Sequence, residues 1–253
     1  MLMINQKKSK PLFLFFFLKQ DKKKMTSDVL LLPPTIADEP TTIEQVSPQF
    51  IITNPHAFWK GPSDKLGDET SRIRRNQFVN AKTHVDLKNS RTNEIVRVLY
   101  SKDHTIVGLV PTIHRSQIDL NRKRNSDSFY QQVFTHFLQK NPSAIVLDIH
   151  SYPISHTWNN TVNESVDLVI LYSPRSKDLA ESLQRYLTPS FSVVILQGGE
   201  NLIMDSSVEQ GHKALLLEFP DGKDNHNADT MIRNILLFLK LDNSIVQVGN
   251  LTP

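Results

Sequence analysis

Ala144-Ile-Val-Leu-Asp148-Ile-His150-Ser151 is the stretch of sequence that decides the fold. Its aliphatic and β-branched residues predict a strand buried on both faces, and Pro153 ends it. Side chains at positions i and i+2 of a strand point to the same face, so Asp148 and His150 emerge together at its carboxyl end. Open α/β sheets bind their ligands at that edge. Such a pair is also common as a turn or capping arrangement, so it indicates a site only together with other polar clusters.

The other apolar runs of the chain alternate between strand and helix patterns. Strands are predicted at 49–53, 94–100, 105–113, 166–172, 191–196 and 213–219, and helices at 72–80, 126–140, 176–187 and 228–241. In the second helix Phe129, Val133 and Phe137 recur at helical spacing, and Ser126 or Asp127 is the expected N-cap. This alternation predicts an α/β fold with a mixed, mainly parallel sheet flanked by helices on both faces.

The first residues differ from the rest in composition. Residues 1–24 contain seven lysines and one acid around an eight-residue apolar run, Pro11-Leu-Phe-Leu-Phe-Phe-Phe-Leu18, which is too short to span a bilayer. Lysines follow where a signal peptide would have its cleavage site. We therefore expect a disordered leader or a start upstream of the natural one, with weak membrane-surface contact as the alternative. Residues 25–47 are expected to be an extended lead-in, and 48–245 a single catalytic domain.

Composition excludes several classes of function. The net charge is +3, but outside the leader 22 basic residues face 25 acidic ones, so charge gives no support to nucleic-acid binding. The eight glycines form neither a Walker loop nor a G-x-G-x-x-G motif. The absence of cysteine excludes thiol catalysis and Cys-ligated zinc, and it fits a cytoplasmic protein. Any metal would be held by histidines and carboxylates.

One polar cluster near the start of the domain combines a histidine that follows a predicted strand with carboxylates that come after a loop. Asn54-Pro55-His56 is followed after a loop by Gly67-Asp68-Glu69-Thr70-Ser71. Catalytic zinc takes three protein ligands, and a histidine with a nearby carboxylate would complete a set with His150. The alternative is a loop histidine beside a helix N-cap.

Two further clusters supply arginines and a carboxylate. His114-Arg115-Ser-Gln-Ile-Asp119-Leu-Asn121-Arg122 brings two arginines behind a strand, where a guanidinium can bind a carboxylate or stabilise an oxyanion; a solvated basic turn is the alternative. Glu218 ends the aliphatic run 214–217 and would be costly to bury unless it is paired or functional. Facing a metal-bound water it would serve as general base, and otherwise it reaches solvent.

The order and spacing of four motifs resemble those of the N-formylglutamate amidohydrolase family. The motifs are Pro55-His56, Ile118-Asp119-Leu-Asn-Arg122, Leu147-Asp148-Ile-His150-Ser151 and Leu217-Glu218. The resemblance covers roughly residues 48–240. That family is similar to the zinc carboxypeptidases and related phosphorylase- and hydrolase-like folds, so the resemblance implies a mixed sheet flanked by helices and one zinc ion.

The resemblance also implies roles for individual residues. It makes His56, Glu69 and His150 the zinc ligands, with Asp68 as the alternative to Glu69. It makes Glu218 the general acid/base and Arg115 the group that polarises the scissile carbonyl. Asn121 and Arg122 would hold a substrate carboxylate, while Asp119 and Asp148 would orient the ligands.

The sequence departs from the family at two places. Ala57-Phe58 stands where the family usually has Ser-Gly, and His114 stands where it has a small residue. The pocket is therefore expected to be bulkier and more apolar, which leaves the acyl group open. The resulting expectation is a metal-dependent amidohydrolase acting on a small molecule or peptide with a free carboxylate. The alternatives are a carboxypeptidase- or γ-glutamyl-hydrolase-like peptidase and a non-catalytic binding module that kept the fold.

Overall fold

The computed structural model describes most of the chain. The described residues are 29–31, 47–56, 66–158, 161–162, 166–198, 201–222 and 227–249. The leader expected at 1–24 and most of the lead-in lie outside them.

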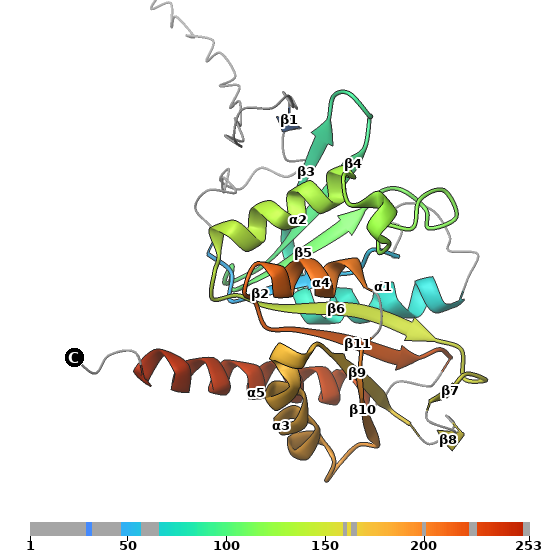
Figure 1. The fold of residues 1–253 in the computed structure, drawn as a ribbon, viewed down its shortest axis with the longest axis vertical. Coiled ribbons are helices and arrows are strands. Elements are labelled where there is room, and N and C mark those ends of the chain that lie inside the picture. The colour runs from blue at the N-terminus through green and yellow to red at the C-terminus, as the bar shows by residue number, and fades with distance from the viewer. Residues whose placement is uncertain are drawn as a thin grey trace, which may run out of the picture.

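A mixed nine-stranded sheet organises the molecule (Figure 1). Its order is β1-β3-β4-β5-β2-β6-β11-β9-β10. The strands are β1 (Val29–Leu31), β2 (Phe50–Thr53), β3 (Ala81–Asn89), β4 (Ile95–Ser101), β5 (Ile106–Pro111), β6 (Ile145–Tyr152), β9 (Leu168–Tyr172), β10 (Val193–Gln197) and β11 (Ala214–Pro220), and β7 (Thr157–Trp158) pairs with β8 (Thr161–Val162) in a separate ribbon. The pairings from β5 through β2 and β6 to β11 are parallel, as is β9 with β10, whereas those of β1, β3 and β4 and that of β11 with β9 are antiparallel.

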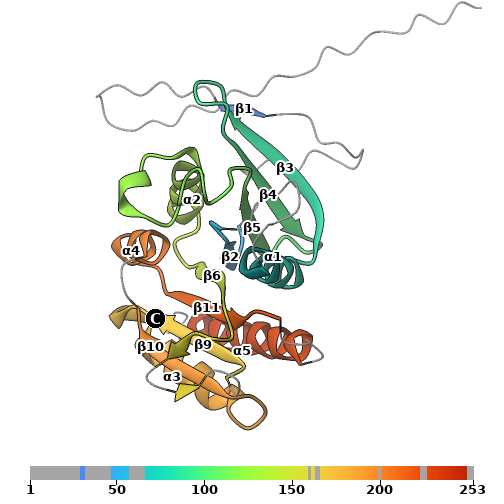
Figure 2. The ribbon, with the colours of Figure 1, turned by 90° about the vertical axis from the view of Figure 1, so that its right-hand side faces the viewer.

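Five helices cover the two faces of the sheet. They are α1 (Leu66–Val79), α2 (Phe129–Lys140), α3 (Lys177–Leu187), α4 (Leu202–Glu209) and α5 (Ala228–Gly249). Figure 2 shows α2 and α4 on one side of the sheet and α1 and α5 on the other. The side chains divide accordingly: Phe50 and Ile52 pack with α1, α3 and α5, whereas Ile51 packs with α2 and α4. Residues of a strand that is buried on both faces alternate in this way, which explains the continuous apolar runs.

The same alternation places the polar residues of β6. Val146 belongs to the cluster that packs against α2 and α4, whereas Leu147 and Ile149 belong to the opposite cluster. Asp148 and His150 therefore point to the α2 and α4 face, both deeply buried.

The fold class predicted from the sequence is confirmed, and each predicted strand and helix has a counterpart, although α1 begins six residues earlier and α5 ends eight residues later than predicted. The strands β3, β7 and β8 and the helix α4 were not predicted, and β1 adds part of the expected lead-in to the sheet edge beside β3. The N-cap prediction for α2 was wrong. Ser128 caps this helix by accepting a hydrogen bond from the backbone N–H of Gln131.

Helix α1 also begins earlier than the predicted 72–80. It starts at Leu66, so Asp68 and Glu69 lie in its first turn and not in a preceding loop. Carboxylates are favoured there because the helix dipole is positive at its N-terminus. Because a helix has 3.6 residues per turn, the side chains of Asp68 and Glu69 point in different directions from the helix axis.

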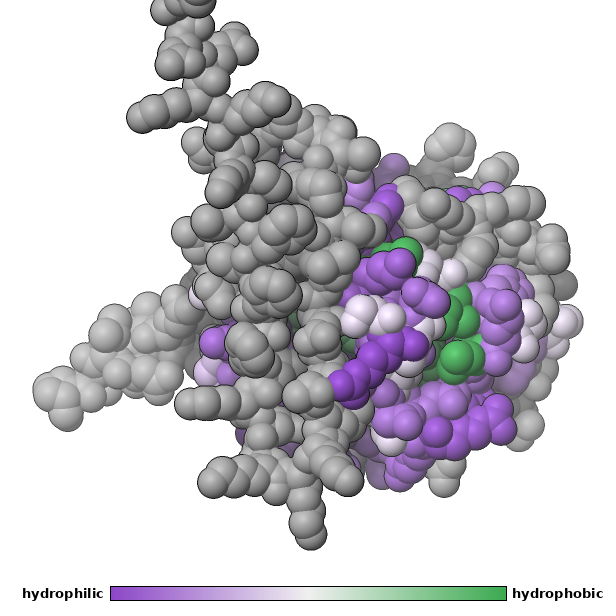
Figure 3. Space-filling view, turned by 90° about the horizontal axis from the view of Figure 1, so that it is seen from above, coloured by the Kyte–Doolittle hydropathy of each residue, from purple (hydrophilic) through white to green (hydrophobic). Residues whose placement is uncertain are grey.

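The described surface is mostly polar. Seen from above in the orientation of Figure 3, hydrophilic residues dominate the coloured part and surround a small hydrophobic group. The large hydrophobic residues that are exposed lie on separate elements: Ile73, Ile154, Tyr186 and Leu237. Among the described helices, none is both long and apolar enough to cross a lipid bilayer.

A glycine in β5 allows α1 to pack closely on the sheet. A Cβ atom on Gly108 would lie 2.7 Å from Cγ2 of Val79, at the end of α1. We expect Gly108→Ala to lower the free energy of unfolding by about 1–3 kcal/mol, because the β-branched Val79 cannot easily turn away. Gly198→Ala is the control, since its nearest neighbour would be at 3.6 Å, and it should be close to neutral. Urea denaturation measures both, and equal effects would contradict this packing.

Candidate active site

The ends of three adjacent parallel strands, β2, β6 and β11, form one edge of the sheet. His56 follows β2 by three residues, His150 lies near the end of β6, and Glu218 lies near the end of β11. Glu218 is the register partner of His150, and Asp148 is the register partner of Thr53. Register partners on neighbouring strands share a face, so the polar residues that end these strands gather in one place.

Each histidine of the site is held by its own carboxylate. Nε2 of His56 lies 3.0 Å from Oδ1 of Asp119, and Nε2 of His150 lies 2.8 Å from Oδ2 of Asp148. The two rings are 4.8 Å apart between centroids and perpendicular. Because Nε2 of each ring is engaged, a metal would be coordinated through Nδ1. Carboxylate–histidine pairs of this kind orient metal ligands and fix their tautomer.

Asp148 is completely buried and is satisfied by several donors. Besides His150, the hydroxyl of Thr53 donates to Oδ1 at 2.7 Å, and the side-chain amide of Asn201 donates to Oδ2 at 3.3 Å. Burial alone raises the pKa of Asp148, but the charge of His150 and these hydrogen bonds outweigh it, so the pKa lies below its usual value. The carboxylate is therefore ionised at the centre of the sheet.

Asp119 links His56 to the arginine-rich loop. Its Oδ2 lies 3.7 Å from Nε of Arg115 and 3.4 Å from Nε of Arg122, and the backbone N–H of Asn121 donates to Oδ1 at 3.1 Å. The hydrogen bond from His56, together with the charges of His56 and Arg115 and the bond from Asn121, holds the pKa of Asp119 well below its usual range. The loop that carries both arginines is thus anchored to the histidine.

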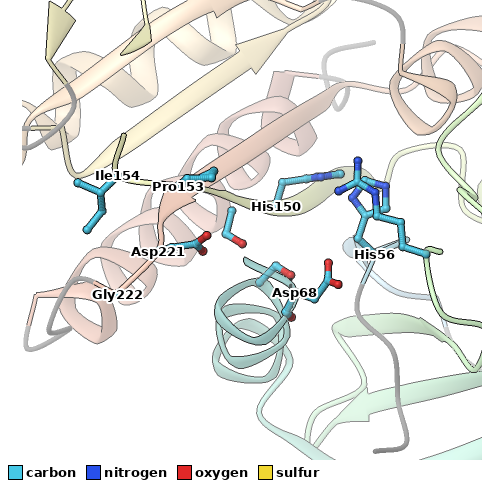
Figure 4. A pocket seen from close by; sticks show the side chains of 10 residues that line it. His56, Asp68, His150, Pro153, Ile154, Asp221 and Gly222 are labelled. Carbon is cyan, nitrogen blue, oxygen red and sulfur yellow. Dashed lines mark hydrogen bonds between the residues drawn. The ribbon is translucent and has the colours of Figure 1, made fainter. Parts of the chain in front are cut away.

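These residues border a pocket of about 600 Å³. The described residues that line it are His56, Asp68, Ser71, Arg115, His150, Ser151, Pro153, Ile154, Asp221 and Gly222. Figure 4 shows His56 towards one end of the pocket and Ile154 towards the other, with Asp68 reaching in from the first turn of α1. Of the residues predicted for the site, the pocket wall includes both histidines and Arg115.

The predicted third ligand, Glu69, does not line this pocket. Its side chain is 48% exposed and lies 3.5 Å from Nη2 of Arg72. Asp68, the alternative, is 5% exposed and lines the pocket, and its Oδ2 has no hydrogen-bond partner. The geometry therefore favours Asp68 over Glu69. Among the described residues, however, no three His, Asp or Glu side chains are grouped closely enough to hold a metal ion as they stand.

The structure places the other predicted residues around the pocket. Asn121 is buried, and its Oδ1 accepts a hydrogen bond from the backbone N–H of Ile203, so it fastens the start of α4. The side chain of Arg122 is 53% exposed and pairs with Asp119. Neither lines the pocket. Glu218 is not part of the wall either, but its Oε2 is buried without a hydrogen-bond partner, and its burial raises its pKa.

Three residues were missed by the sequence-based reasoning. Thr53 and Asn201 bind Asp148, and Asp221 lines the pocket just after β11. Thr53 is the last residue of β2 and could have been found from the parallel register with Asp148. Asn201 is the N-cap of α4, a helix that was not predicted. Asp221 follows Pro220 in what reads as an ordinary turn.

Comparisons with known proteins assign no family to the chain. Neither the protein-family models nor the curated proteins give a match. Solved structures with a similar arrangement include the gene product Atu2144 from Agrobacterium tumefaciens, with a TM-score of 0.49, 9% identity and coverage of 82% of this chain and 94% of that one. Pyrococcus furiosus PbaA, an archaeal homolog of proteasome-assembly chaperone, has a TM-score of 0.46 and 13% identity, covering 83% and 85% of the two chains.

Hydrolases are also among the solved structures. The N-acetylmuramoyl-L-alanine amidase AmiC2 of Nostoc punctiforme has a TM-score of 0.40 and 12% identity, covering 76% of this chain and 97% of that one. Since a chaperone homolog and an amidase both occur, likenesses at this level assign no activity to the chain.

The hydrogen bond between Thr53 and Asp148 should be a large contribution to stability. We expect Thr53→Val, which keeps the shape and removes the hydroxyl, to lower the free energy of unfolding by about 1.5–3 kcal/mol, because a buried ionised acceptor loses a donor. Thr53→Ser keeps the hydroxyl and loses one methyl group, which should cost about 1 kcal/mol. Denaturant titration compares the two variants, and a smaller loss for valine than for serine would contradict this interpretation.

Proposed function

We propose that the protein is a zinc-dependent hydrolase that cleaves an amide bond next to a free carboxylate. The observation that carries the proposal is the pair of histidines, each oriented by a buried or half-buried carboxylate through Nε2, at the shared end of neighbouring parallel strands. This arrangement agrees with the order of motifs in the N-formylglutamate amidohydrolase family that the sequence resembles.

Three residues would hold the zinc ion: His56, His150 and Asp68. The donor set suits zinc, which accepts imidazole nitrogens and carboxylate oxygens. The Oδ2 of Asp68 in the pocket wall accepts no hydrogen bond, and its ion-pair contact with Nε2 of His114 is long, at 3.9 Å. This supports its choice as the third ligand, since a buried carboxylate oxygen without a hydrogen bond is costly unless a cation compensates it. A shift of these side chains towards one another would have to accompany binding, because they do not form a closed ligand group as they stand. When bound, zinc would supply Lewis-acid polarisation and a nucleophilic water near neutral pH.

Glu218 would act as the general base and then as the acid for the leaving amine. Its position beside His150 on the neighbouring strand brings a carboxylate next to the proposed metal ligand. Its Oε2 is buried without a hydrogen-bond partner and can accept a proton from a water molecule in the site. No other carboxylate on the described part of β11 is placed in this way.

The two arginines would act on the substrate. Arg115 lines the pocket with a side chain that is 39% exposed, so its guanidinium can stabilise the oxyanion that develops on the scissile carbonyl. Arg122, which is more exposed on the same loop, would bind the free carboxylate of the substrate from outside the pocket wall. Asn121 contributes by fixing this loop to α4, which is a change from the direct contact expected from the family pattern.

One observation favours a second function. The absence of a closed group of three ligands among the described residues also fits a binding module that kept the fold and the pocket without the metal. A peptidase with the same metal chemistry differs only in the substrate atoms that it recognises. Metal content separates the binding module from both enzymes.

Metal content is the first test. We expect about one zinc ion per chain in wild-type protein purified without chelator, measured by mass spectrometry of the metal, and hydrolysis of N-acyl amino acids. His150→Ala and Asp68→Asn should lose most of the metal and the activity, because each removes a ligand. Glu69→Gln, one residue away, should retain both. Zinc-free wild-type protein would contradict the proposal and leave the binding module, and loss of metal in Glu69→Gln alone would make that residue the ligand.

The role of Glu218 predicts a separation of metal binding from turnover. Glu218→Gln should keep the zinc ion and lower kcat by about 10²–10⁴-fold, because the proton acceptor is lost while the histidines stay in place. Glu209→Gln, on the exposed end of α4, is the matched control and should behave as wild type. Unchanged kcat in Glu218→Gln, with metal present, would remove this residue from the mechanism.

A further inference from the structure

A second carboxylate of the pocket has no role in the proposed chemistry. Asp221 directly follows β11, and its backbone N–H donates to the carbonyl oxygen of Tyr152 at 2.8 Å. The residue is 5% exposed and belongs to the pocket wall. Figure 4 shows Asp221 on the side of Pro153, Ile154 and Gly222, with its carboxylate pointing into the pocket towards the side of Asp68.

Among the residues that the structure describes, the charge of Asp221 is only partly compensated. Its carboxylate accepts hydrogen bonds from the hydroxyls of Ser151 and Thr70, but Oδ1 has no hydrogen-bond partner. Burial raises its pKa, and the charged neighbour that acts on it is a second carboxylate, Asp68, which raises it further. A buried carboxylate oxygen with neither a donor nor a cation is unfavourable and calls for a compensating group.

A purely structural role does not account for this arrangement. Two hydroxyl donors and the backbone bond would join β6, β11 and α1 equally well through a neutral asparagine, which accepts the same hydrogen bonds without a buried charge. What a carboxylate adds is negative charge facing the pocket. The group that uses this charge would come from a ligand.

The pocket therefore has two ends of opposite character. Arg115 lies at the end next to the histidines, where Asp119 contacts it. Asp221 lies towards the other end, with the apolar side chains of Pro153 and Ile154, and accepts a hydrogen bond from Ser151, which also lines the pocket. A ligand that spans the pocket would meet a positive group first and a negative group second.

We propose that Asp221 binds a positively charged amino group of the substrate, which makes the substrate class an amide that carries both a carboxylate and an ammonium group. An ammonium has three donors, so it can satisfy Oδ1 and still bond to the neighbouring hydroxyl of Ser151. The aliphatic stem next to the amino group would pack on Pro153 and Ile154. The inference rests on the proposed function in one respect: the metal takes up the charge of Asp68 and leaves Asp221 for the substrate.

The test measures binding without turnover, on the protein as purified. The probes are 4-aminobutanoate and 6-aminohexanoate, each compared with the acid of the same length that lacks the amino group, butanoate and hexanoate. Isothermal titration measures each affinity. Of the two amino acids, the one that binds wild type more tightly should bind it about tenfold more tightly than its matched acid, because its ammonium group gains a charge-assisted hydrogen bond to a buried carboxylate. Asp221→Asn, which keeps the hydrogen-bond acceptor, should bind both members of each pair equally.

A control variant separates local contact from overall charge. Asp127→Asn removes the same charge from an exposed position away from the pocket and should keep the tenfold preference. Wild type that binds neither amino acid more tightly than its acid overturns the inference, as does a preference that survives in Asp221→Asn. Because the probes contain no amide bond, these outcomes do not depend on hydrolysis. A preference without zinc or turnover would refute the proposed hydrolase and keep Asp221 as an amino-group site.

Discussion

The buried charge of Asp148 is the constraint on which the site depends. An ionised carboxylate at the centre of a sheet costs several kcal/mol unless donors surround it. Here the donors come from the end of β2 (Thr53), from β6 itself (His150) and from the cap of α4 (Asn201). Satisfying one charge therefore fixes the ends of two parallel strands and the start of a helix. The histidine ring is oriented by the same set of bonds.

The carboxylate of Asp119 likewise fixes the loop that follows β5. Asp119 bonds to His56 and lies close to Arg115 and Arg122, so the positions of these side chains depend on one another. Asn121 then ties this loop to α4, which also carries the cap that binds Asp148. The two histidines thus belong to one network that runs through the start of α4. Substitution of either Asp119 or Asp148 should therefore change the orientation of both histidine rings.

The sequence predicted the strands that carry the site better than the side chains that surround the pocket. Buried strands ending in polar residues are visible as aliphatic runs, so β2, β6 and β11 and their histidine or glutamate residues could be found. β3 was missed because its lysines, aspartate and histidine interrupt the apolar pattern of an edge region, and α4 because eight residues with mixed polarity show little helical periodicity. Asp68 and Glu69 could not be separated, since the direction of each side chain depends on where α1 begins. Asp221 gave no signal, because its burial comes from three elements that meet only in the folded chain.

The distribution of charge in the pocket follows from the same edge of the sheet. Strands, a helix and a loop contribute carboxylates to this edge, and each carboxylate meets a different environment. Asp119 and Asp148 are bonded to histidines, whereas Asp68 and Asp221 keep an oxygen without a partner. Bonded carboxylates orient groups of the protein, and unbonded ones are available to cations from outside it. Oε2 of Glu218, the proposed proton acceptor, also lacks a hydrogen-bond partner. The pattern of satisfied and unsatisfied oxygens therefore separates the residues that orient the site from those that would bind its metal and its substrate or accept a proton.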